Sequence, residues 1–221
     1  MNTTNLIARR AVFAPAIALF SAHMLGGCLP LVVGGAVVGS TLVATDRRTS
    51  GAQLEDEGIE LRSINRLREA FLERVHINAT SYNRQVLLTG EVPTEADKQR
   101  AQEIVSRVEN VRSIVNELAV LGNATLTSRS SDALVTGRVK ASFVDAKDLY
   151  ANAFKVVTER GTTYLLGRVT QREATRATEI ARTTPGVQRV VRVLEIISEE
   201  ELQRLLPQPP KPGTAPVQPS N

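Results

Sequence analysis

The chain contains an internal repeat with a period of about 76 residues, and this repeat constrains the fold more than any other feature of the sequence. Residues 87–92 (LLTGEV) recur as residues 164–169 (YLLGRV), and a polar stretch follows both copies. Gly90 and Gly167 are 77 residues apart, whereas Val111 and Val187 are 76 apart. This difference places a one-residue deletion in the turn before the polar stretch. The repeat predicts two copies of one small module rather than a single larger domain.

Each copy has the hydrophobic patterns of five elements in the order α-β-β-α-β. An amphipathic helix opens the copy, with apolar side chains at helical spacing: Ile59, Leu61, Ile64, Leu67 and Leu72 in the first copy, and Leu134, Val135, Val139 and Phe143 in the second. Two strands with a tight turn between them follow, at residues 77–80 and 85–88, then 154–158 and 163–166. A second helix is predicted over 94–108 and 171–183, and a last strand over 114–120 and 190–197. About 75 residues of this kind can form a module that folds alone.

The amino-terminal segment indicates export and lipid attachment. Arg9 and Arg10 precede an uncharged apolar run that ends in Leu25-Gly26-Gly27-Cys28, where Cys28 is the chain's single cysteine. This pattern is typical of a secretory signal and resembles the bacterial lipobox, which implies that Cys28 carries acyl chains and becomes the first mature residue. Two alternatives stay open, a buried unmodified cysteine and a membrane-spanning anchor extended by the uncharged residues 29–45. Pro30 and several glycines interrupt that longer run, and no disulfide can form within the chain.

The sequence therefore predicts five segments in an α+β chain. They are a lipoprotein signal peptide (1–27), a lipidated Gly/Val-rich tether (28–45), a first module (46–121), a second module (122–197) and a Pro-rich disordered tail (198–221), which holds six prolines between residues 207 and 221.

The Leu-Leu-(Thr)-Gly-x-Val step, the polar helix after it and the Asn/Gly-Val-x-x-Val-Val entry into the last strand resemble the bacterial BON domain, present here twice. Tandem copies behind a lipobox resemble the dual BON-domain lipoproteins of the Gram-negative outer membrane. The resemblance implies that each module is a three-stranded mixed sheet with two helices on one face. It also implies binding of anionic phospholipid and support of envelope integrity, from a lipid-anchored position facing the periplasm at the inner leaflet of the outer membrane.

By the same resemblance, the phospholipid-binding surface is the opening helix of the second module, at Leu134, Arg138, Val139, Lys140 and Val144. Basic side chains beside apolar ones suit an anionic bilayer, because the charges attract head groups while the apolar groups enter the acyl boundary. Another interpretation is that Val135, Val139 and Phe143 belong to the core and that Arg138 and Lys140 are merely solvated. Arg172, Arg176 and Arg182 on the later helix form a second basic face.

Charge is distributed unevenly between the modules. Residues 46–121 hold 11 basic and 13 acidic side chains, whereas residues 122–197 hold 12 basic and 7 acidic, a net of +5. The opening helix of the first module mixes Arg62, Arg66 and Arg68 with three glutamates, so its field largely cancels. The second module is therefore the candidate for an anionic partner. The chain as a whole, at +4, lacks the strong positive charge of a nucleic-acid-binding protein.

The sequence shows no pattern of enzymatic chemistry. His76 has no partner at a metal-ligand spacing, and no nucleophile elbow or phosphate-binding loop is present. We therefore expect a non-enzymatic protein without cofactor or metal, in which His76 is a polar residue at the start of a strand. The predicted function is binding of anionic phospholipid through the second module. The alternative is a periplasmic scaffold whose modules dock envelope-assembly, division or cell-wall proteins while the acyl chains alone attach it to the membrane.

Overall fold

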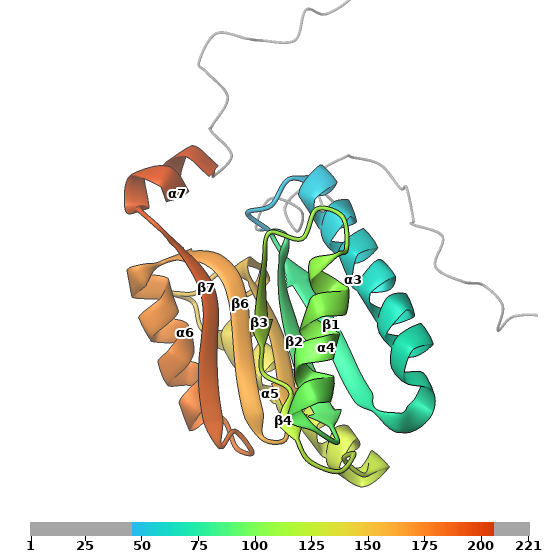
Figure 1. The fold of residues 1–221 in the computed structure, drawn as a ribbon. Coiled ribbons are helices and arrows are strands. Elements are labelled where there is room, and N and C mark those ends of the chain that lie inside the picture. Colours follow the sequence, from blue (N-terminus) through green and yellow to red (C-terminus); the bar gives the residue numbers. More distant parts are fainter. Residues whose placement is uncertain (1–45, 206–221) are drawn as a thin grey trace, which may run out of the picture. The chain divides into compact units, whose positions relative to one another are not determined.

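The computed structural model describes residues 46–205, which contain two copies of the α-β-β-α-β module (Figure 1). The predicted lipidation site, signal peptide and tether lie outside the described residues. The first module consists of α3 (Ser50–Phe71), a 3-10 turn (Leu72–Arg74), β1 (His76–Tyr82), β2 (Gln85–Val92), α4 (Glu95–Ser106), β3 (Ser113–Asn116) and β4 (Ala119–Val120). Strand β2 pairs antiparallel with β1 and parallel with both β3 and β4. The single last strand predicted over 114–120 is thus two short strands along the same edge, because Leu118 turns into the core between them.

The second module repeats this order with a longer last strand. It consists of α5 (Leu126–Asp145), a 3-10 turn (Ala151–Ala153), β5 (Phe154–Glu159), β6 (Thr162–Thr170), α6 (Gln171–Thr183) and β7 (Arg189–Ile197). Strand β6 is central, antiparallel to β5 and parallel to β7 over nine residue pairs. Together the modules confirm the predicted α+β class and the mixed sheets. The N-caps Thr94 and Thr170 are 76 residues apart, so the structure places the deletion between β6 and α6, where the second copy is one residue shorter than the first copy is between β2 and α4.

Each module has its own hydrophobic core between its helices and one face of its sheet. In the first module, Ile59 and Phe71 of α3 and Val105 of α4 pack on Val86 and Leu88 of β2. In the second, Val139 and Phe143 of α5 pack with the alanines of α6 on Leu165 and Val169 of β6. Side chains alternate between the two faces of a strand, so Leu87, between Val86 and Leu88, points to the opposite face.

The helix-free faces of the two sheets pack against each other. Tyr82 and Leu87 from the first sheet and Tyr164, Leu166 and Val193 from the second form one buried apolar cluster. Polar pairs surround it: Arg189 with Glu117 at 3.6 Å, Arg112 with Glu195 at 3.4 Å, and Lys155 with Glu60. The sequence predicts two separate modules, whereas residues 46–205 form one compact unit with two module cores and a third cluster between the sheets.

A buried ion pair connects the segment before α3 to the second module. The Arg47 guanidinium donates to both Glu173 carboxylate oxygens, at 2.8 and 2.6 Å, and to the carbonyl of Arg168 at 2.9 Å. Glu173 also accepts a hydrogen bond from the backbone of Thr170, which completes the capping box of α6. Burial opposes ionisation of Glu173, but the hydrogen bonds from Arg47 and Thr170 outweigh it and lower the pKa of this carboxyl.

The segment after β7 differs from the predicted tail. Residues Glu199–Leu205 form helix α7, in which Leu202 is buried and Glu201 pairs with Arg168. Three glutamates in its first turn favour the helix, because negative charge there complements the helix dipole. Within residues 46–205, none of the helices combines the length and the apolar character needed to cross a bilayer.

Candidate functional site

Helix α5 presents an unusually apolar face to solvent. It begins after Thr125, whose hydroxyl accepts from the Ser128 amide, and it buries Asp132, Val135, Val139 and Phe143 as one stripe. The opposite face carries Leu126, Leu134 and Val144, which are 78%, 64% and 72% exposed. Ala133, Gly137 and Ala141 are also exposed on this helix. Soluble helices normally place polar residues on the face away from the core, so this face points to an interaction.

Two basic side chains flank the apolar face, and neither forms an ion pair in the described part of the chain. Arg138 is exposed and donates to the carbonyl of Pro185 at 3.4 Å, and Lys140 is also exposed. Helix α5 holds two acidic residues: Asp132 is buried under the β5–β6 turn, and Asp145 is exposed at the last position of the helix, beside Val144. The surface therefore combines apolar groups and positive charge, as an anionic interface requires.

The structure places the five predicted site residues in two different environments. Leu134, Arg138, Lys140 and Val144 are exposed on α5. Val139 is fully buried in the second core, packed with Phe143. Its assignment to the lipid-binding surface is therefore not compatible with this structure, because a side chain on the inward stripe of the helix cannot reach a membrane.

The opening helix of the first module is less suited to an anionic surface. Arg62 pairs with Glu55 at 2.7 Å, and Arg66 donates to the carbonyl of Arg107 at 2.6 Å. Leu61 is exposed to nearly the same extent as Leu134, at 62%, but acidic side chains lie on the same helix. The two basic residues of α6 nearest its start are paired as well, Arg172 with Glu199 and Arg176 with Asp148.

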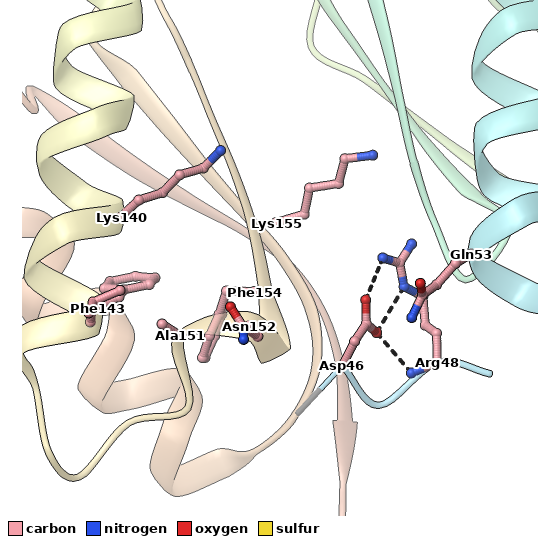
Figure 2. Close-up of a pocket in the computed structure, with 10 residues that line it drawn as sticks. Asp46, Arg48, Gln53, Lys140, Phe143, Ala151, Asn152, Phe154 and Lys155 are labelled. Carbon is pink, nitrogen blue, oxygen red and sulfur yellow. Dashed lines mark hydrogen bonds and ion pairs between the residues drawn. The ribbon is translucent and has the colours of Figure 1, made fainter. Parts of the chain in front are cut away.

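A cavity of about 710 Å³ opens beside the C-terminal half of α5 (Figure 2). Its second-module lining includes Lys140, Phe143, Val144, Phe154 and Lys155. The rings of Phe143 and Phe154 meet edge to face, with centroids 5.3 Å apart.

The first module contributes Asp46, Arg48 and Gln53 to the same cavity. Arg48 is held by Asp46 and Asp56, both at 2.8 Å, and lies over the ring of Tyr82. The sequence could not reveal this cavity, because its walls come from segments about 100 residues apart that are joined by the packing of the sheets.

His76 has carboxylate partners that its sequence spacing does not reveal. It begins β1, as predicted, and its Nδ1 lies 3.0 Å from Glu91 of β2 and 3.8 Å from Glu159 of β5. Burial raises the pKa of the Glu159 carboxyl. These three residues could supply ligand atoms to a divalent cation, but Arg160 already lies 3.5 Å from Glu91 and supplies positive charge there. The cluster is best described as a polar contact between the modules.

Comparison with known proteins agrees with this architecture. The family model described as BON domain matches residues 55–122 and 131–198. The chain is 37% identical to "Outer membrane lipoprotein DolP" of Haemophilus influenzae over 82% of this chain and 95% of that protein. It is 32% identical to "21 kDa hemolysin" of Actinobacillus pleuropneumoniae over 69% of this chain and 79% of the relative. A solved structure of CdsD from Chlamydia trachomatis, 13% identical over 66% of this chain and 96% of that one, has a TM-score of 0.27, too low to support an argument.

The two matches and the repeated α-β-β-α-β unit define a protein with tandem BON domains. The chain belongs to the BON domain family, and the predicted resemblance to the dual BON-domain lipoproteins of the outer membrane is confirmed.

Proposed function

We propose that this protein is a non-enzymatic lipoprotein of the outer membrane that faces the periplasm, binds anionic phospholipid and supports envelope integrity. The exposed apolar face of α5 between Arg138 and Lys140 carries this proposal. Leu134 and Val144 would enter the acyl boundary, while the two cations would lie near the head groups. The resemblance to the outer-membrane lipoprotein from Haemophilus influenzae supports the location.

Vesicle binding tests this surface. Each basic residue near an anionic bilayer contributes on the order of 1 kcal/mol, so Arg138→Glu with Lys140→Glu should weaken binding of residues 39–221 more than tenfold. Leu134→Glu should also weaken it, because a carboxylate must stay hydrated. Co-sedimentation with vesicles of increasing phosphatidylglycerol content measures both effects, and circular dichroism checks folding.

The first module supplies matched controls for each change. Arg68→Glu with Arg74→Glu makes the same change in charge at exposed positions of that module, and Leu61→Glu replaces a leucine of similar exposure. These variants should bind vesicles nearly as the parent protein does. Equal losses of vesicle binding from the changes in both modules would indicate that binding depends on the overall charge of the protein and not on a surface of α5. Unchanged binding in all variants would favour the scaffold function, in which the modules dock envelope proteins.

Lipid attachment at Cys28 is the second part of the proposal. A Cys28→Ala chain should stay an uncleaved precursor and incorporate no radiolabelled palmitate, because the thiol that accepts diacylglycerol is missing. The parent protein should fractionate with the outer membrane, since more than one acyl chain gives stable attachment. Normal maturation of the variant would contradict the lipoprotein assignment, and recovery of the parent with inner-membrane vesicles would contradict the location.

A further inference from the structure

The cavity beside α5 has the composition of a site for one amphiphilic anion. Its volume of about 710 Å³ lies within the range of small-ligand pockets. Phe143, Val144, Ala151 and Phe154 supply apolar surface, and the lining carries three cations, Arg48, Lys140 and Lys155, against one carboxylate, Asp46.

The three cations differ in how they are held. Arg48 is fixed by Asp46 and Asp56, and Lys155 is paired with Glu60 of α3 and donates to the carbonyl of Ser81. Lys140 has no ion pair among residues 46–205, and its side chain extends from α5 in the same direction of the view as that of Lys155 (Figure 2). An entering anion would therefore meet one uncompensated ammonium beside two cations whose positions are already set.

The cavity also adjoins the proposed membrane surface. Lys140 and Val144 line the cavity and belong to the exposed part of α5. A bilayer docked on α5 would bring head groups to this opening.

We propose that this cavity binds the phosphate and adjoining glycerol and acyl carbons of a single anionic phospholipid, with the first module forming one wall. The inference rests on the proposed lipid binding of α5 and deepens it. Inorganic phosphate would use the cations alone, whereas a phospholipid also covers Phe143 and Phe154. The first module thus has a role in recognition: Arg48 and Gln53 line the site from the side opposite α5 (Figure 2).

A monomeric lipid separates this site from membrane docking. Residues 39–221, labelled with nitrogen-15, are titrated with dihexanoylphosphatidylglycerol below its micelle concentration. The amides of Ala151, Asn152 and Lys155 should shift in a saturable manner. Dihexanoylphosphatidylcholine and inorganic phosphate should each bind at least fivefold more weakly, because the first lacks net negative charge and the second lacks apolar groups. Equal affinity for either probe, or shifts confined to other regions, would overturn the proposal.

Variants that fill the cavity complete the test. Gln53→Trp and Ala151→Trp add bulk from two different walls, and both positions lie off the exposed face of α5. Each should reduce affinity for the monomeric lipid at least tenfold, and Lys140→Gln, a surface change with little risk to folding, should reduce it severalfold. Unchanged affinity in all three would refute the site.

Leu134→Glu distinguishes the two proposals. It should retain the affinity for monomeric lipid and lose binding to vesicles. If it binds vesicles normally while the filling variants lose the monomeric lipid, the α5 surface fails and the cavity site stands.

Discussion

At the scale of single residues, two buried aspartates hold the β-hairpins of the two modules. Asp56 accepts from the backbone amides of Asn83 and Arg84 at 2.7 and 2.8 Å, and Asp132 accepts from those of Arg160 and Gly161 at 2.8 and 2.9 Å. All four turn residues have positive φ, as two-residue hairpin turns require. The repeat contains the signal for this role, because the two aspartates are 76 residues apart, but only the fold brings each carboxylate to its turn.

Asp56→Asn should destabilise the protein by about 2–3 kcal/mol at neutral pH, because an amide cannot accept all these hydrogen bonds as a carboxylate does. Burial alone would raise the pKa of Asp56, but hydrogen bonds from Ser81, Arg84, Arg48 and Asn83 outweigh it and hold this pKa below its ordinary value of 3.8. The carboxylate therefore stabilises the fold above that value, and this contribution is lost as the pH falls through the lower native pKa. Urea unfolding at several pH values should show a smaller loss on acidification in the variant. An unchanged dependence on pH below 4 would contradict this role.

At the scale of elements, the sequence predicts the order and type of the helices and strands well and their boundaries less well. The repeated apolar patterns locate all five elements of each module, because each pattern is read twice. The break between β3 and β4 was missed, since residues 114–120 are mostly apolar and fit one strand, and the pattern does not show that Leu118 is buried between two short strands. Helix α7 was missed because the proline-rich residues after it dominate the composition of that segment. The cap of α4 is only half of a capping box: Thr94 accepts from the Asp97 amide, and its hydroxyl donates to the Asp97 carboxylate.

The two equivalent helix caps should differ in their contribution to stability. Glu173→Gln should cost about 3 kcal/mol, because it leaves the buried guanidinium of Arg47 without its carboxylate. Asp97→Asn at the equivalent position of α4 should cost less than about 1 kcal/mol, since that cap is exposed. Thermal unfolding of both variants measures the difference. Similar losses would show that capping alone, and not the ion pair with Arg47, determines the effect at α6.

At the scale of the whole molecule, the contact between the sheets explains a pattern that the sequence shows but does not resolve. Residues 86–88 and 164–166 are continuous apolar runs, whereas a strand with one solvated face alternates. The structure uses both faces of each central strand: Leu88 and Leu165 lie in the module cores, and Leu87 and Leu166 lie between the sheets. A single sequence does not specify which surface covers the second face. This packing also creates the cavity beside α5, so the lipid site proposed there could not be predicted from motifs.

The cluster between the sheets should make the two modules unfold together. Leu87→Ala with Leu166→Ala removes apolar volume from that cluster, and Leu88→Ala with Leu165→Ala removes the same number of carbons from the two module cores; all four leucines are fully buried. Each double change should cost several kcal/mol, since one buried Leu→Ala costs about 2–5 kcal/mol.

Only the first pair should separate the unfolding of the modules, because it weakens the contact that couples them. Urea titrations followed through the amide signals of Gly90 and Gly167 give a midpoint for each module. We expect one shared midpoint in the parent protein and two midpoints in Leu87→Ala/Leu166→Ala. The variant Leu88→Ala/Leu165→Ala should be less stable than the parent protein. Its two glycine signals should still change at one shared midpoint, because the contact between the sheets is intact. Coincident midpoints in the first pair would show that the contacts left between the sheets, which include Tyr82, Tyr164 and the charged pairs at the edge of the interface, are sufficient to couple the modules.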